Sequence, residues 1–208
     1  MSVNLDDRSV RRLLDPLFFI AAILTGVLSR RPVRPLEDED RRPLPGDDLL
    51  PAANGRWTHA ITIRAQPRDI WPWLVQMGCR RAGWYSYDGL DNGGVPSVDR
   101  IVPTLQQVEV GDLFAWTPTA YDGFIVRAFE PERSLVLGGT AGSLYRTTWA
   151  FVLERIGETS TRVLARSSGE YTRLAVGLFL WFVLRPIHFA MQRKQLLNLK
   201  QRVEAGPV

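Results

Sequence analysis

The hydrophobic pattern divides the chain into three parts. Residues 1–30 contain an apolar run, Leu17 to Leu28, with arginines on both sides; residues 31–55 are rich in proline and charge and show no apolar period; and a patterned domain occupies residues 56–208. The run is shorter than the roughly 20 apolar residues that cross a bilayer, and no small-residue cleavage site follows it. We therefore expect an interfacial helix or a helix docked on the domain, followed by a linker or an extended wrap.

Within residues 56–208, the pattern predicts a strand, a helix and then a series of strands. Alternation from Trp57 to Ile63 predicts a half-buried strand. Helical spacing follows, with Pro67 in the first turn and Gly78 as a stop. Five short runs rich in β-branched and aromatic residues then alternate with turn sequences. They predict an antiparallel meander, and they lie within residues 110–118, 123–131, 133–139, 145–156 and 161–171.

A long helix is expected from about Tyr171 to Ala205. Its second half is amphipathic, whereas its first half, Leu174 to Leu184, is apolar on all sides. Pro186 should kink the helix between these halves. The expected fold is α+β: a curved antiparallel β-sheet wrapped around a long C-terminal helix, with an extra N-terminal apolar helix. A cavity should open where the sheet and the helix diverge.

Local sequences add to this expectation. Ala65, Pro67 and Trp71 occupy an A-x-P-x-x-x-W pattern at the opening strand and helix, and "RAGWYSYDGLDN", "DRIVPTLQQVEVGD" and "MQRKQLLNLKQRVE" follow. From about Trp57 to Ala205 the chain resembles the SRPBCC superfamily of START-like, helix-grip proteins, in particular a bacterial branch of mostly uncharacterised members. The resemblance implies the helix-grip fold. It does not choose among the activities on that fold, such as lipid or sterol carriage and polyketide cyclisation or dehydration.

Composition narrows the function classes. The net charge of +4 is mild, and no dense basic run or reading motif occurs, so no nucleic acid is expected as a partner. The single cysteine, Cys79, excludes an internal disulfide and favours a reducing compartment. Two histidines make a poor metal site, and phosphate-loop and nucleophile-elbow motifs are missing. We therefore expect no metal, no cofactor and a cytoplasmic location, with membrane association as an open alternative.

The aromatic stretch at residues 84–87 is the leading candidate for ligand contact. Its three rings carry polar tips, which suits a pocket that holds and orients an apolar ligand. The same side chains could instead close the open end of a small core. Inward positions on the expected strands and on the last helix complete the candidate set, which is Trp84, Tyr85, Tyr87, Trp116, Trp149, Phe151 and His188.

Other polar residues allow two interpretations each. Asp88 and Asp91 are expected to cap a short helix rather than to act as catalytic acids. His59 should face inward together with Trp57, as a core residue or as an acid–base group. Four arginines should lie on the solvent face or bind an anionic head group inside, namely Arg127, Arg146, Arg162 and Arg166.

We therefore expect a domain that binds a small hydrophobic or amphipathic ligand, such as a lipid, a sterol or a polyketide-like molecule, between the sheet and the C-terminal helix. Membrane contact would come through Leu17 to Leu28 and the apolar half of the last helix; the basic stretch Arg185 to Glu204 could add contact with anionic lipid. One alternative is a cyclase or dehydratase type of enzyme that uses Tyr85 or Tyr87 with Asp88, or a histidine, for proton transfer. Another is a protein or lipid interaction module with a vestigial cavity.

Overall fold

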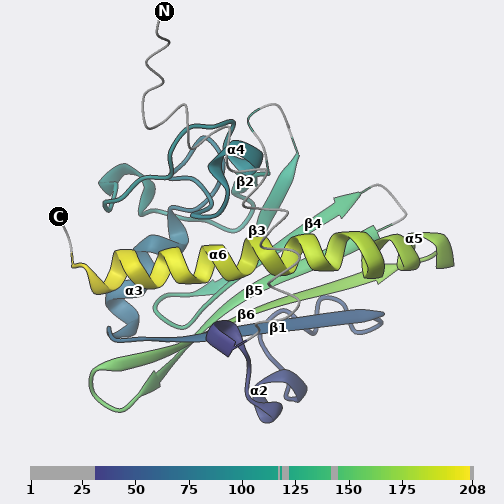
Figure 1. The fold of residues 1–208 in the computed structure, drawn as a ribbon, viewed down its shortest axis with the longest axis horizontal. Helices are drawn as coiled ribbons and strands as arrows, with labels where there is room; N and C mark the ends of the chain where they lie inside the picture. Colours follow the sequence, from purple (N-terminus) through teal and green to yellow (C-terminus); the bar gives the residue numbers. More distant parts are fainter. Residues whose placement is uncertain (1–30, 117, 119–121, 142–144, 207–208) are drawn as a thin grey trace, which may run out of the picture.

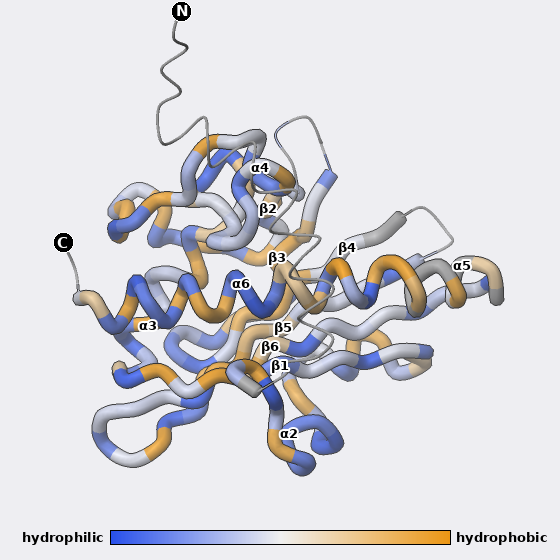
Figure 2. Tube along the Cα trace, viewed as in Figure 1, coloured by the Kyte–Doolittle hydropathy of each residue, from blue (hydrophilic) through white to orange (hydrophobic). Residues whose placement is uncertain are grey.

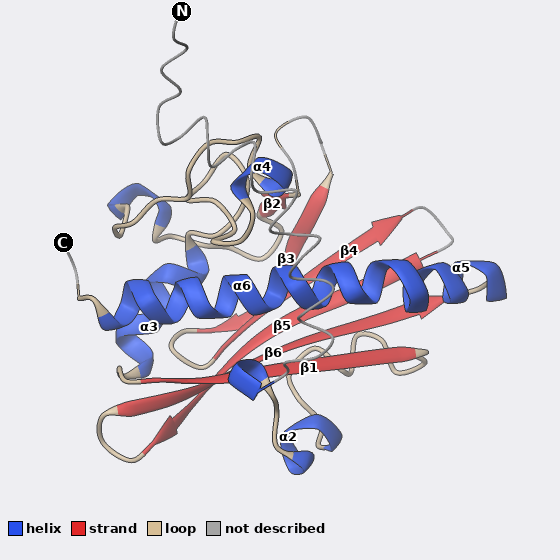
Figure 3. Cartoon of the chain, in the orientation of Figure 1, coloured by secondary structure: helices blue, strands red, loops and turns tan. Residues whose placement is uncertain are grey.

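The computed structural model describes residues 31–116, 118, 122–141 and 145–206. The expected N-terminal apolar helix, within residues 1–30, lies outside the described residues. The described chain is α+β, with a six-stranded antiparallel sheet in the order β1-β6-β5-β4-β3-β2 and a long C-terminal helix across one face (Figures 1 and 3). The strands are β1 (Gly55–Ile63), β2 (Leu113–Ala115), β3 (Gly123–Glu130), β4 (Ser134–Ala141), β5 (Tyr145–Ile156) and β6 (Ser160–Tyr171). The expected helix-grip arrangement is thus confirmed, including the strand, helix and meander order.

The helices fall into short connecting elements and one long C-terminal run. The connecting elements are η1 (Arg31–Val33), α2 (Glu37–Arg41), α3 (Pro67–Val75), α4 (Asp88–Asp91) and η2 (Pro103–Leu105). The C-terminal run consists of α5 (Leu174–Phe179), a π-helical segment (Leu180–Leu184) and α6 (Arg185–Glu204), which follow one another directly (Figure 3). The kink expected at Pro186 stays a prediction, but the helical run is π-helical immediately before the turn that contains this proline. A proline cannot donate the helical hydrogen bond and crowds the preceding turn, and the wider π turn accommodates both effects.

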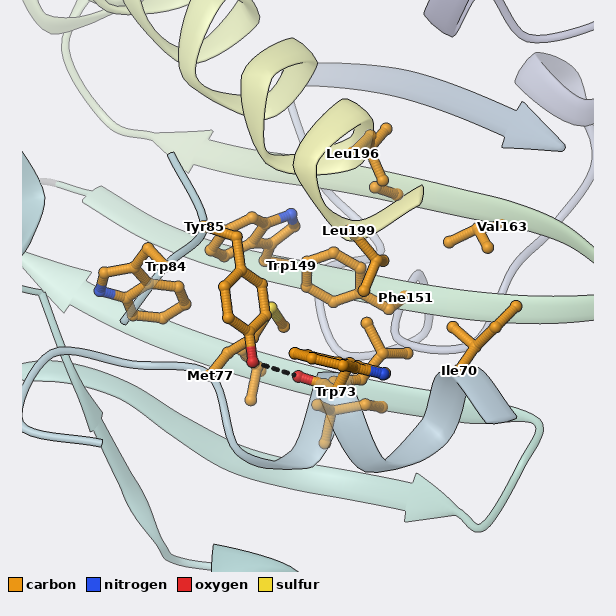
Figure 4. Packing of buried hydrophobic residues seen from close by; sticks show 14 of the residues in the cluster. Ile70, Trp73, Met77, Trp84, Tyr85, Trp149, Phe151, Val163, Leu196 and Leu199 are labelled. Atoms are coloured by element: carbon orange, nitrogen blue, oxygen red, sulfur yellow. Dashed lines mark hydrogen bonds between the residues drawn. The ribbon is translucent and has the colours of Figure 1, made fainter. Parts of the chain in front are cut away.

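The core lies between the sheet and the helices α3 and α6. Alternate residues of the central strands, including Phe151 of β5 and Val163 of β6, meet Ile70 of α3 and Leu199 of α6 (Figure 4). In Figure 2 the helix α6 carries alternating apolar and polar bands. The expected amphipathic division is not found, because the residues that α6 buries include polar ones: they are Ala190, Gln192, Gln195, Leu196 and Leu199. Burial of the apolar side chains supplies the main driving force for the fold.

Residues 31–50 wrap around the edge of the sheet at β1. Val33 is buried in the main core, on the side of α6, whereas Leu44 belongs to a second apolar cluster with Leu164. Because side chains alternate along β6, Leu164 points away from the face on which Val163 packs. The chain therefore starts on the helix side of the sheet, passes the edge strand β1 and covers part of the other face.

Candidate functional site

The aromatic stretch at residues 84–87 is part of the core. Tyr85 is 1% exposed, and its hydroxyl donates to the Trp73 carbonyl at 3.1 Å (Figure 4) while it accepts from Gln76 Nε2 at 2.9 Å. Its backbone N–H donates to Ser97 Oγ, and its carbonyl accepts from Asn198 Nδ2. Burial raises the pKa of the Tyr85 phenol, so this group stays protonated. Tyr85 is therefore held by the protein from four directions, and a role in proton transfer stays a prediction.

The backbone conformation explains why a glycine, Gly83, directly precedes this stretch. Tyr85 has φ of 57°, a left-handed conformation that is rare for a bulky residue and costs on the order of 1–3 kcal/mol. Gly83 has φ of 83°, and a Cβ there would lie 2.3 Å from Ser97 Oγ. The chain thus turns sharply against the Ser97 segment, and the turn drives the aromatic rings inward.

Two of the predicted tryptophans stack on each other beneath α6. The rings of Trp84 and Trp149 have centroids 5.4 Å apart. A chain of hydrogen bonds joins them through the helix: Trp149 Nε1 donates to Gln192 at 2.8 Å, Gln192 donates to Gln195 at 2.7 Å, and Gln195 donates to the Trp84 carbonyl at 3.0 Å. The indole N–H of Trp84 donates to the Ala115 carbonyl at 3.1 Å, so the polar tips of Trp84 and Trp149 are both used within the protein.

The other predicted aromatic residues lie in the aromatic core around Trp149 or close to it. Phe151 is fully buried beside Trp149, with ring centroids 4.9 Å apart. Trp116 packs edge-on against Phe124 at 5.6 Å. Tyr87 is buried below the Lys194 ammonium, which lies 3.9 Å from the ring centroid. Ligand contact by these aromatic residues stays a prediction.

His188 lines a pocket of about 740 Å³ at the edge of the sheet. The pocket lies between residues 33–41, the edge strand β1 and the beginning of α6. Its aromatic side chains are those of Trp57, His59, His188 and Phe189. None of the other six predicted residues lines it, so the structure brings His188 to a pocket and places the rest elsewhere.

The two histidines meet in this pocket. His59 and His188 have ring centroids 6.1 Å apart, and the His59 ring is 5.1 Å from that of Phe189. His188 Nε2 lies 3.0 Å from Ser167 Oγ. Burial among aromatic rings lowers the pKa of His188 to about 4, so its imidazole is neutral at pH 7. The sequence pattern predicts that both histidines face inward, but nothing in it indicates that they meet.

Charged residues surround the aromatic part of the pocket. Four arginines and two carboxylates line the pocket, which gives an excess of two positive charges. The arginines are Arg34, Arg41, Arg56 and Arg185, and the carboxylates are those of Glu37 and Asp40. Arg41 pairs with Glu37 at 2.8 Å and Arg56 approaches Asp47 at 3.6 Å. Among the residues that the structure describes, none forms an ion pair with Arg34. The pocket therefore combines apolar rings with a net positive charge.

Two arginines considered for the inner cavity bind the wrapped segment instead. Arg162 makes two hydrogen bonds to the Glu39 carboxylate, at 2.7 and 2.8 Å. Burial alone would raise the pKa of Glu39, but the bonds from Arg162 and from the Leu36 N–H outweigh it and hold this pKa below its usual value. Arg166 is 2% exposed and pairs with Asp47 at 2.6 Å. These arginines lie on the outer face of β6, but residues 39–47 cover them, and no head group is needed to explain them.

The expectation that Asp88 caps a short helix is wrong, because the N-cap of α4 is Tyr87, whose own side chain makes no capping hydrogen bond. Capping by Asp91 stays a prediction. The Asp88 carboxylate accepts from the backbone N–H and the hydroxyl of Ser97 and so fastens the turn to its neighbour. Asp91 is buried, and burial together with the nearby Asp88 raises its pKa to about 7.

Comparisons with protein-family models and with curated proteins give no match. Among solved structures, the chain is similar to a hypothetical protein of Helicobacter pylori, with 11% identity and a TM-score of 0.49 over 81% of this chain and 94% of that one. A protein of Thermus thermophilus shows 18% identity and a TM-score of 0.40 over 73% and 98%. The di-domain ARO/CYC protein BexL of the BE-7585A biosynthetic pathway shows 13% identity and a TM-score of 0.41 over 74% and 48%. Similarities of this size identify neither a family nor an activity for this chain.

Two further observations concern the described part of the chain. No helix there combines the length and the hydropathy that crossing a membrane requires. No three His, Cys, Asp or Glu side chains gather there in a way that could hold a metal ion.

Proposed function

We propose that this protein binds a small amphipathic molecule with an acidic group in the pocket between β1, α6 and residues 33–41. The observation that carries the proposal is the pairing, in one pocket of about 740 Å³, of four aromatic or imidazole rings with an excess of two positive charges. A volume of this size suits a small-molecule ligand, and such sites combine apolar walls with a few oriented polar groups. We further propose that the chain is a divergent SRPBCC, START-like protein, which the order of its elements supports.

The rings and the arginines would take different parts of the ligand. Trp57, His59 and Phe189 offer apolar surface for a chain or a ring system. Arg34 offers a planar guanidinium for a carboxylate, phosphate or sulfate, and such a group forms paired, charge-assisted hydrogen bonds with arginine. The indole N–H of Trp57 is buried and has no acceptor among the described residues.

Isothermal titration calorimetry with dodecanoate and with dodecanol tests this proposal. The two probes have the same alkyl chain and differ in charge. The proposal predicts that the wild-type protein binds dodecanoate more tightly than dodecanol, and that Arg34→Gln lowers the affinity for the acid by about tenfold, a typical effect of one charge-assisted contact. Affinity for the alcohol should stay unchanged.

Arg68→Gln is the matched control, because Arg68 is also exposed but lies on α3, away from the pocket. It removes the same charge from the protein. Equal loss in the two variants would show that only the overall charge matters, and equal affinity for acid and alcohol would remove the basis for an acidic ligand.

A second candidate function is acid–base chemistry on the bound molecule. It is favoured by His188, whose imidazole is neutral at pH 7 and lies in the pocket beside His59. A neutral imidazole can accept a proton from a substrate. Mass spectrometry of the molecule that copurifies with the protein would distinguish the candidates: a carrier returns it unchanged after incubation, whereas an enzyme converts it and His188→Asn stops the conversion without preventing binding.

A further inference from the structure

The first half of the C-terminal helical run exposes a concentrated apolar surface. Leu178 is 50% exposed, Phe182 70% and Val183 43%. The other exposed large apolar residues in the described part of the chain are scattered over loops, strands and the short helix α4. Leu178 and Phe182 are four residues apart and therefore lie near one another along the helix. These three residues are called the apolar ridge below.

The charge around the apolar ridge is of one sign. From Thr172 to Val203 the sequence has six lysines and arginines and no aspartate or glutamate. Arg173, which is exposed, precedes the ridge by one turn, and Arg185 follows it directly. Glu170, an acidic residue just before this stretch, is paired with Arg146 at 3.2 Å. A bare apolar surface between arginines matches an anionic bilayer, which accepts apolar side chains and attracts cations at its headgroups.

We propose that the apolar ridge is a docking surface for a bilayer that contains anionic lipid. Leu178, Phe182 and Val183 would enter the boundary between headgroups and acyl chains, and Arg173 and Arg185 would contact the headgroups. This mode needs no helix that crosses the bilayer. Residues Arg185 and Pro186 also line the pocket, so docking would bring the pocket beside the lipid surface. The docking proposal itself does not depend on the pocket having a ligand.

Flotation with lipid vesicles tests the proposal on the full chain. The vesicles contain either phosphatidylcholine alone or phosphatidylcholine with phosphatidylglycerol. Wild-type protein should float with the anionic vesicles, and raising the salt concentration should weaken binding, since headgroup attraction is screened. The double variant Leu178→Gln, Phe182→Gln should lose roughly tenfold or more in partitioning, because two large apolar side chains no longer enter the lipid.

The control variant carries Leu113→Gln and Ile156→Gln, which replace two residues of similar exposure, 44% and 50%, outside the helix. It should bind as the wild type does. All four positions are exposed, and glutamine is a good helix former at the two helical ones, so both variants should fold.

Three results would overturn the proposal. If the ridge variant floats like the wild type, another segment such as Leu17 to Leu28 makes the contact. If both double variants lose binding equally, no particular surface is responsible. If wild-type protein does not float but is a dimer by light scattering, and the ridge variant is a monomer, the ridge binds a second copy of the chain.

Discussion

Arg166 and Asp47 form a buried ion pair, with 2.6 Å between Nη1 and Oδ2, that fastens the wrapped N-terminal segment to the outer face of the sheet. The same guanidinium donates to the backbone carbonyls of Glu39, Asp40 and Arg42 and to Thr58 Oγ1. One side chain thus satisfies five acceptors on two parts of the chain. Residues 33–41 form one wall of the pocket. Arg166 therefore holds this wall in place through its bonds to the Glu39 and Asp40 carbonyls.

Replacing this arginine should destabilise the protein strongly. Arg166→Met breaks the buried ion pair with Asp47 and removes the donor of three backbone carbonyls, which should cost about 3–5 kcal/mol in the free energy of unfolding. Arg146→Gln breaks an exposed ion pair with Glu170 and should cost less than about 1 kcal/mol. Urea denaturation measures both effects. If the two variants were equally stable, the wrapped segment would not depend on Arg166.

The phenol of Tyr85 is predicted to matter for stability and not for ligand affinity. Tyr85→Phe removes the hydrogen bonds with the Trp73 carbonyl and Gln76 and should cost about 1–3 kcal/mol, since both partners are buried. Calorimetry with dodecanoate should give the wild-type affinity. A variant with wild-type stability but weaker binding would instead place Tyr85 in contact with the ligand.

His188 should make stability depend on pH in the acidic range. Its pKa in the folded protein is about 4, below the ordinary 6.5, so the unfolded chain binds more protons between these values and stability falls as pH decreases from about 6.5 to about 4. The difference amounts to about 2 kcal/mol, allowing for partial contact with water. His188→Asn should remove this part of the dependence, as measured by urea denaturation at pH 7.5, 5.5 and 4.5. An unchanged slope in the variant would contradict the assignment.

Asp91 should make the stability of the protein depend on pH in the opposite sense to His188. Its folded pKa is about 7, above the ordinary 3.8, so the folded protein binds more protons and stability falls as pH rises from about 4 to about 7. Asp91→Asn should therefore gain stability relative to the wild type at pH 8 by about 1–3 kcal/mol. The control is Asp99→Asn, since Asp99 is 86% exposed; it should change little at any pH. A destabilised Asp91→Asn variant at pH 8 would show that the carboxylate is needed in its charged form.

The fold could be predicted from local patterns, whereas the pocket could not. Alternation in β5 and the spacing in α3 depend on burial of neighbouring residues, and both are visible in the sequence. The inward position of Tyr85 depends on Ser97 and Asn198, which are distant in the sequence. The pocket exists because residues 31–50 wrap around β1, and that path depends on a buried arginine more than a hundred residues away.

A few signals for the pocket were nevertheless present. Trp57 and His59 were expected on the inner face of the first strand, and both line the pocket. The proline-rich stretch before this strand carries Arg34 and Arg41, but a charged linker in water has the same composition. The sequence does not show the path of this segment. It therefore indicates the aromatic stretch at residues 84–87 as the leading candidate for ligand contact.

The most direct test of ligand binding in the pocket at β1 follows the tryptophan indole N–H signals by NMR while dodecanoate is added. The chain has seven tryptophans, and single Trp→Phe variants assign Trp57, Trp84 and Trp149. Trp57 lines the pocket, whereas Trp84 and Trp149 are hydrogen-bonded inside the core. We therefore expect the Trp57 signal to shift to saturation and the other two signals to stay in place. Shifts at Trp84 and Trp149 with none at Trp57 would contradict this expectation and would place the ligand under α6, among the aromatic residues of the core.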